Sequence, residues 1–244
     1  MNPLLSIVIP AYNEAGRVRR TLEAISEYAA GREVPAEIIV VDDGSRDATA
    51  HIVARAARTQ NERPHAPPIR LIRESTNRGK GFALRRGVAV SRGTRVLTCD
   101  ADLSTPIEEL DKLASRLDLG FDIAIASRDL PESRLAPAQP PLRRLAALAF
   151  QALRSGLLLP GLRDTQCGFK LFRGTLARSL FADAHLDGWL IDCEVLALAA
   201  RRGYRIAEVG VTWRDDRDSR VRPLRDAPRT AHELLTIMRR WARE

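Results

Sequence analysis

The chain has 244 residues, 45% of them hydrophobic and 29% charged, a composition typical of one large folded domain rather than of a disordered chain. The formal net charge of +8 points to an anionic partner: a nucleic acid, a membrane surface or a small substrate. Aromatic residues make up only 5%, which argues against an RNA binder that stacks bases, so we expect no nucleic-acid partner.

The first half of the chain alternates short apolar segments with amphipathic ones. We expect strands at residues 4–9, 37–41, 69–72, 95–99 and 122–126, and helices at residues 14–30, 48–58, 79–90 and 106–117. This alternation predicts an α/β fold, a mostly parallel Rossmann-like sheet with helices on both faces. Ligands of such sheets bind beyond the carboxyl ends of the strands, and the polar motifs of this chain follow the expected strands.

The second half is less regular. Residues 130–141 are rich in proline and predict a loop. The apolar residues of 142–159 fall roughly on one helical face flanked by arginines, which fits either a helix lying on a membrane or a core helix under the site. A helix at 188–202 and a strand at 204–211 complete a domain of residues 1–226. Residues 227–244 then predict an amphipathic helix that packs on this domain or extends from it.

Two further features bear on cellular location. The chain begins without the basic segment of a secretory signal, and no apolar run reaches the roughly 18 residues that a membrane-spanning helix needs. The three cysteines form no CxxC motif and suggest no disulfide framework. We therefore expect a cytoplasmic protein, either free or bound at the cytoplasmic face of a membrane.

The segment Asp100-Ala101-Asp102 carries two carboxylates two residues apart, directly after an expected strand. Hard carboxylate oxygens suit Mg²⁺ or Mn²⁺, which keep coordination positions free for phosphate oxygens. A metal that bridges two phosphates neutralises the leaving group of a sugar transfer. The same spacing also fits two acidic residues in a solvated turn that binds no metal.

Three other motifs follow expected strands. Asp42-Asp43-Gly44-Ser45 fits a strand-to-helix turn with a cap, and equally a carboxylate directed at a base or a ribose. The segment from Pro10 to Glu14, which contains Tyr12, fits a turn or the frame of a nucleoside pocket. Asn77 to Gly81 is glycine-rich without being a Walker A loop, and its backbone amides and Lys80 suit a phosphate at a helix start.

In this order and spacing, the four motifs resemble those of the inverting family 2 glycosyltransferases, which have the GT-A fold. Further segments resemble the dolichyl-phosphate β-glucosyltransferase branch of this family. They are the extension of the Asp100 motif to Pro106, Ser127-Arg128, Arg163 to Phe172, Trp189 to Glu194, Glu208 to Trp213 and Ser219 to Val221. The resemblance therefore covers the chain from about Leu5 to Val221.

The resemblance implies roles for individual residues. The nucleotide-sugar would be bound by residues from all four motifs: Pro10, Ala11, Tyr12, Glu14, Asp42, Asp43, Lys80, Asp100 and Ala101. Asp102, with Asp100, would hold the metal, and Ser104 stands where the related mannosyl branch tends to place a glutamine ligand. Arg128 and Arg220 would bind the acceptor phosphate or the donor diphosphate through bidentate contacts.

The catalytic base is the open question. Asp164 is our first candidate and Asp192 the second, and either carboxylate could instead be structural. A lipid phosphate acceptor is already an anion and needs no strong base, whereas a sugar hydroxyl acceptor would need one.

The predicted function is the transfer of a hexose, glucose from UDP-glucose in the first place, to a polyprenyl or dolichyl phosphate. Two alternatives stay open. One keeps the donor and changes the acceptor to a soluble molecule or a glycan, and the other is a nucleotide-sugar-binding protein without transfer activity.

Overall fold

The computed structural model describes residues 3–63, 66–136, 159, 161–214, 233–237 and 239. Of the sequence predictions, Arg220 and nearly all of 142–159 lie outside these residues. Of the expected final helix 227–244, the structure describes residues 233–237 and 239, which are helical. No helix in the described part of the chain has the length and apolar character needed to cross a membrane.

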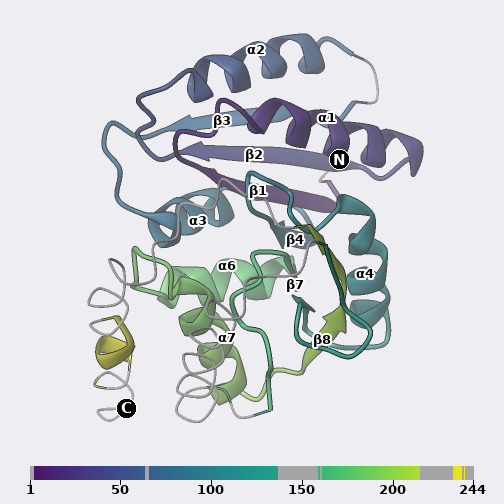
Figure 1. Cartoon of the computed structure of the whole chain (residues 1–244), viewed down its shortest axis with the longest axis vertical. Helices are drawn as coiled ribbons and strands as arrows, with labels where there is room; N and C mark the ends of the chain where they lie inside the picture. The colour runs from purple at the N-terminus through teal and green to yellow at the C-terminus, as the bar shows by residue number, and fades with distance from the viewer. Residues whose placement is uncertain are drawn as a thin grey trace.

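Seven of the described strands form one sheet in the order β3-β2-β1-β4-β7-β5-β8 (Figure 1). Their bounds are β1 (Leu5–Ala11), β2 (Ala36–Asp42), β3 (Ile69–Arg73), β4 (Arg95–Thr98), β5 (Ile123–Ser127), β7 (Lys170–Arg173) and β8 (Ile206–Gly210). All of these pairings are parallel except those of β7, which runs antiparallel to both β4 and β5. The expected α/β class with a mostly parallel sheet is confirmed.

Helices cover both faces of the sheet (Figure 1). One face carries α1 (Val18–Gly31), α2 (Thr49–Asn61) and the short η1 (Ile107–Glu109), which leads into α4 (Leu110–Asp118). The other carries α3 (Lys80–Ala89), α6 (Gly174–Asp183) and α7 (Ile191–Arg201). Alternate residues of β1 serve the two cores, with Ile7 and Ile9 on the first face and Val8 on the second. Because both faces are buried, such strands are apolar throughout.

The second half of the chain departs from the sequence prediction in two places. Strand β7 and helix α6 were not predicted. A short strand, β6 (Arg134–Ala136), lies inside the expected loop 130–141 and pairs in parallel with β9 (Thr212–Arg214). Strands β6 and β9 have three residues each, and such short runs carry too little periodicity to be recognised from sequence. Strand β7 has a charged residue at each end, Lys170 and Arg173, and so lacks the apolar run that indicates a buried strand.

Candidate functional site

Three of the four motifs lie side by side, because they follow the neighbouring strands β2, β1 and β4. Ala11 at the end of β1 is in register with Asp42 at the end of β2. The backbone N–H of Asp43 donates to the carbonyl of Ala11 at 2.8 Å, and that of Cys99 donates to the carbonyl of Val8 at 3.1 Å. The motifs therefore converge at one edge of the sheet, as expected for parallel strands.

The loops after β1 and β2 are bonded to each other. Ser45 Oγ accepts a hydrogen bond from the N–H of Asn13 at 2.8 Å, and Asn13 Oδ1 accepts one from Arg46 at 2.8 Å. The N–H of Glu14 donates to Thr49 Oγ1 at 2.7 Å. Asn13 has a φ of 54°, a left-handed conformation that asparagine tolerates better than most residues. The two loops form one unit, with Tyr12 and Glu14 partly exposed on it.

Asp43 serves the glycine-rich loop 77–79 rather than the surface. Its carboxylate accepts hydrogen bonds from Asn77 Nδ2 at 2.8 Å and from the N–H groups of Arg78 and Gly79 at 3.0 and 2.7 Å. Burial raises the pKa of Asp43, and these amides favour its ionised form. Asp42 is also buried, with Oδ1 accepting from the N–H of Ser45 at 3.1 Å. The geometry thus favours a scaffolding role for Asp43 over the expected nucleotide contact.

The turn Asp100-Ala101-Asp102 follows β4 and is tightly fixed. The carbonyl of Ala101 accepts a hydrogen bond from Thr21 Oγ1 of α1 at 2.7 Å, and Asp102 Oδ1 accepts one from the N–H of Ser104 at 2.9 Å. Leu103 adopts a φ of 49°, which is uncommon for a leucine and is found where the surrounding structure enforces it. Both carboxylates therefore have defined positions.

The two carboxylates fit a divalent cation. Burial, and after it the nearby charge of Asp100, raises the pKa of Asp102, so a cation between them would relieve their mutual repulsion. A Cβ at position 168 would collide with the Asp100 carboxylate, so Gly168 leaves room for it. No group of three or more potential metal-ligating side chains occurs among the described residues. Ser104 adds no carboxylate, and the remaining ligands would come from water or phosphate oxygens.

A chain of alternating charges runs inward from this turn. Lys80 Nζ lies 2.9 Å from Asp100 Oδ1 and 3.1 Å from Asp192 Oδ2. Asp192 Oδ1 in turn lies 2.6 Å from Lys170 Nζ, which also donates to the carbonyl of Cys167. Burial alone would raise the pKa of Asp192, but Lys170 and Lys80 lower it below its usual range. The two lysines therefore favour the ionised form of Asp192, which disfavours the catalytic-base role that we considered for it.

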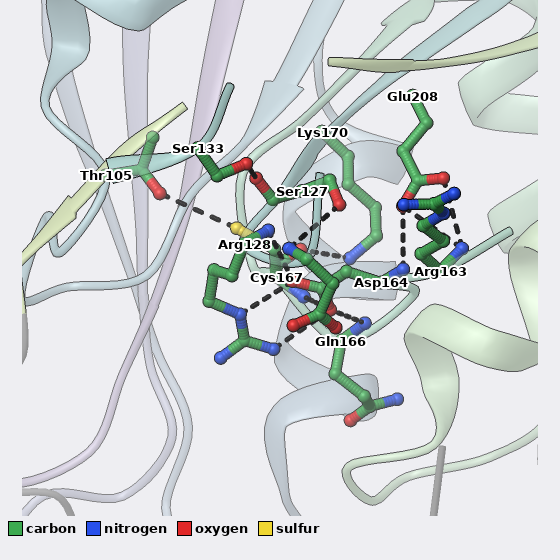
Figure 2. Close-up of polar contacts among 11 residues, drawn as sticks. Thr105, Ser127, Arg128, Ser133, Arg163, Asp164, Gln166, Cys167, Lys170 and Glu208 are labelled. Atoms are coloured by element: carbon green, nitrogen blue, oxygen red, sulfur yellow. Dashed lines mark hydrogen bonds and ion pairs between the residues drawn. The ribbon is translucent and has the colours of Figure 1, made fainter. Parts of the chain in front are cut away.

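Asp164 forms a bidentate ion pair with Arg128 (Figure 2). Its Oδ2 lies 2.6 Å from Arg128 Nε and its Oδ1 lies 2.9 Å from Arg128 Nη2. The carboxylate also accepts the N–H groups of Arg128, Gln166 and Cys167. Burial would raise the pKa of Asp164, but the ion pair outweighs burial and holds the pKa well below its ordinary value. A carboxylate so engaged is a poor proton acceptor, so this environment also disfavours the base role expected for Asp164.

Arg128 itself keeps capacity for a ligand. Two of the five guanidinium N–H groups serve Asp164, and 27% of the side chain is exposed. Its guanidinium carbon lies 5.6 Å from the ring centre of Trp213, a cation–π contact that further fixes it. The expected contact between Arg128 and a phosphate is compatible with this geometry and stays a proposal.

Several residues at the site lie in segments that resemble the family but were assigned no role from the sequence. Glu208 accepts the N–H groups of Arg163 and Asp164 and so shapes the loop that holds Asp164 (Figure 2). The Lys80 ammonium lies 5.6 Å from the ring centre of Trp189, and Trp189 is 41% exposed. Lys170 is 1% exposed, contrary to the usual surface location of lysine. One signal was available: the chain has only three lysines among 39 basic residues, and two of them lie at this site.

Comparison with known proteins gives the site a context. The family model "Glycosyl transferase family 2" matches residues 6–181. A dolichyl-phosphate β-glucosyltransferase of Dictyostelium discoideum is 34% identical over 98% of this chain and 75% of that protein. The human protein of the same name is also 34% identical, over 97% of this chain and 75% of its own length.

Solved structures share the fold. Glucosyl-3-phosphoglycerate synthase of Mycobacterium tuberculosis superposes with a TM-score of 0.69 at 20% identity, covering 97% of this chain and 79% of that chain. A second structure of that synthase, in complex with Mn²⁺, UDP and glucosyl-3-phosphoglycerate, gives a TM-score of 0.70, also at 20% identity, over 97% of this chain and 78% of that one. The expected GT-A arrangement is confirmed by these similarities.

Proposed function

Since this chain belongs to glycosyl transferase family 2, we propose that it transfers a glucosyl residue from UDP-glucose to a polyprenyl phosphate such as dolichyl phosphate. The family and the enzyme class expected from the motifs are confirmed, because the family model covers most of the chain and the named relatives match it almost end to end. Glucosyl transfer to dolichyl phosphate is the activity that these relatives carry in their names.

The observation that carries this proposal is the placement of the Asp100-Ala101-Asp102 turn at the carboxyl edge of the sheet, with Asp100 in contact with Lys80. Two hard carboxylates and one ammonium suit a metal-bound diphosphate. The similarly folded mycobacterial synthase was solved with Mn²⁺ and UDP, which indicates use of a divalent metal and supports UDP as the nucleotide. We assign the metal, Mn²⁺ or Mg²⁺, to Asp102 and Asp100, where it would neutralise the leaving diphosphate.

The reaction follows from the chemistry of the two substrates. An oxygen of the acceptor phosphate attacks the anomeric carbon of glucose, the bond from that carbon to the UDP oxygen breaks on the opposite side, and the configuration inverts. The phosphate is already anionic at neutral pH, so no strong base is needed, in keeping with the engaged carboxylates of Asp164 and Asp192. Arg128, with the N–H groups that Asp164 leaves free, and Arg220 would hold the acceptor phosphate.

The nucleoside pocket is the third part of the proposed site. We place it on the bonded loops after β1 and β2, with Pro10, Ala11, Tyr12, Glu14 and Asp42 lining or shaping it. The support is the interlocking of these loops next to the metal-binding turn. Preorganised loops reduce the entropy lost when a ligand binds.

We also propose that the chain works at the cytoplasmic face of a membrane as a peripheral protein. Its acceptor would be anchored there by the polyprenyl chain, and the net charge of +8 would favour an anionic surface.

The decisive experiment supplies a panel of nucleotide-sugars with a short-chain polyprenyl phosphate and measures nucleotide release together with the lipid product. We expect UDP-glucose to give both in equal amounts. Asp102→Ala should lower turnover about a hundredfold, because the leaving diphosphate loses its electrostatic stabilisation. Asp118→Ala, which removes an exposed carboxylate on the far end of α4, is the matched control and should behave as wild type.

The remaining outcomes separate the alternatives. UDP release without a lipid product would reassign the acceptor to a soluble molecule or a glycan. Binding of UDP-glucose without any release would indicate a binding protein. Full turnover in excess chelator would contradict the metal assignment.

A further inference from the structure

Lys80 contacts both the expected metal-binding turn and the buried interior. Its ammonium lies 2.9 Å from Asp100 Oδ1 and 3.1 Å from Asp192 Oδ2, and its side chain is 9% exposed. Asp100 is 39% exposed, so this ion pair stands at the boundary between the protein and its ligand site. Lys80 is therefore the only one of the chain's three lysines with a carboxylate of that turn as a partner in the described structure.

The position of Lys80 is built into the fold. Asp192 is 3% exposed, and its other oxygen is held at 2.6 Å by Lys170, which is 1% exposed. The start of α3 is fixed as well, since the N–H of Gly81 donates to the carbonyl of Asp187 at 2.9 Å. A Cβ on Gly81 would collide with the carbonyl of Leu186, so the helix start packs directly on that segment. The ammonium cannot move far from Asp100 without losing these supports.

This arrangement has an electrostatic consequence for a metal. A divalent cation coordinated by Asp100 would lie within a few ångströms of the Lys80 ammonium, and like charges at that separation repel strongly in a partly buried site. The diphosphate of a nucleotide changes the balance. Its several negative oxygens can contact the ammonium and the metal together, so the two cations no longer compete for one carboxylate.

We propose that Lys80 makes metal binding at Asp100 and Asp102 conditional on the nucleotide diphosphate. In the absence of nucleotide the ammonium weakens metal binding, and in its presence the ammonium and the metal bind the same diphosphate. Asp192 and Lys170 are positioning residues that keep the ammonium in place. This inference rests on the proposed function, since it assumes a metal and a nucleotide diphosphate at this site.

Metal binding and UDP binding at this site are thermodynamically linked. The factor by which UDP raises the affinity for the metal equals the factor by which the metal raises the affinity for UDP. Removing the ammonium should therefore raise the affinity for the metal alone and reduce this coupling factor. Removing the charge of Asp192 should lower the affinity for the metal in the absence of UDP, because Lys80 then has Asp100 as its remaining carboxylate partner.

The test measures the dissociation constant of Mn²⁺ by electron paramagnetic resonance, with and without UDP, on the full-length chain. We expect Lys80→Met to bind Mn²⁺ alone about tenfold more tightly than wild type and to lose about tenfold of the coupling factor. Asp192→Asn should bind Mn²⁺ alone more weakly. Lys112→Met changes an exposed lysine paired with Glu109 and should leave both quantities unchanged.

Opposite shifts in the two variants distinguish this mechanism from damage to the fold, which would weaken Mn²⁺ binding in both. Lys80→Arg retains the positive charge, so it should restore much of the coupling. If Lys80→Met binds Mn²⁺ alone no more tightly than wild type, or keeps the full coupling factor, the proposal is overturned. A wild-type chain that binds neither UDP nor Mn²⁺ would instead contradict the proposed function itself.

Discussion

Asp164 and Arg128 form an extensive set of hydrogen bonds although they are far apart in the sequence. The two residues are 36 apart, yet the carboxylate of one accepts two side-chain hydrogen bonds and one backbone hydrogen bond from the other. The carboxylate is 1% exposed, so removing it would leave the guanidinium without its partner in a partly buried place. The pair links the end of β5 to the loop before β7.

We predict that Asp164→Asn lowers the free energy of unfolding by about 3 kcal/mol at pH 7. Because the folded pKa of Asp164 lies below its unfolded value, the stabilisation is complete above about pH 4 and is lost as the pH falls further. Urea unfolding at pH 7 and near pH 3 should therefore show a gap between wild type and variant that narrows in acid.

Asp183→Asn is the control for this experiment. Asp183 pairs with Arg202 on the surface, and its side chain is 45% exposed. Such pairs contribute about 1 kcal/mol or less, so this variant should differ little from wild type at either pH. A gap for Asp164→Asn that stays constant with pH would contradict the assigned ionisation.

At this scale the sequence predicted which residues gather but not what each one bonds. Asp43, Asp164 and Asp192 all lie at the site, as their motifs implied. Their carboxylates serve backbone amides, an arginine and two lysines, and nothing in a local motif encodes partners that are more than 20 residues away. Lys170 was assigned no role for the same reason, since the distant Asp192, together with the carbonyl of Cys167, makes its burial favourable.

The loops after β1 and β2 behave as one element. Ser45 Oγ holds the N–H of Asn13, and Asn13 Oδ1 holds that of Arg46, so neither loop is positioned independently. Gly44 also packs on the loop that follows β3, because a Cβ at position 44 would lie 2.6 Å from the backbone of Thr76. The loops after β1, β2 and β3 therefore contact one another and line one edge of the sheet.

We predict that Ser45→Ala raises the KM for UDP-glucose about fivefold and leaves kcat nearly unchanged. The substitution removes one hydrogen bond that preorganises the loop with Tyr12, and such a bond contributes about 1 kcal/mol. Steady-state kinetics with both substrates would check this. Ser115→Ala, which removes an exposed hydroxyl on α4, is the control, and an equal rise in KM there would argue against the loop mechanism.

Among the elements, those of the first half were all predicted, with bounds that differ from the structure by at most four residues, because apolar strands alternate with amphipathic helices there. The second half was predicted less completely. Strand β7 begins with the buried Lys170 and ends with Arg173, so it lacks the apolar run of a recognisable buried strand. Its antiparallel insertion between β4 and β5 depends on tertiary pairing alone.

For the whole molecule, the net charge of +8 bears on where the enzyme meets its acceptor. A basic protein is attracted to an anionic lipid surface by about 1 kcal/mol for each basic residue near it, and salt screens this attraction within roughly 10 Å. If the protein binds such a surface as we propose, it would meet a lipid-linked acceptor there.

We predict that the chain sediments with vesicles containing phosphatidylserine and not with vesicles of phosphatidylcholine alone. Binding should fall by about tenfold or more between low and physiological salt, since exposed charges are screened. Equal binding to both vesicle types would contradict an electrostatic contact, and no binding to either would favour a soluble acceptor.

The place of β7 in the sheet has a consequence for how the protein is made. Strands β1, β2, β3 and β4 are neighbours and come from the first 98 residues, so they can pair while the ribosome is still extending the chain. Strand β5 cannot, because its partners β7 and β8 both follow it in the sequence. The emerging chain would therefore present Asp100 and Asp102 on a paired half-sheet before Asp164, Lys170 and Asp192 exist. The side of the sheet that we expect to bind the nucleotide would thus form before Asp164, Lys170 and Asp192 are synthesised. Pulse-labelled nascent chains would acquire protease resistance in that order.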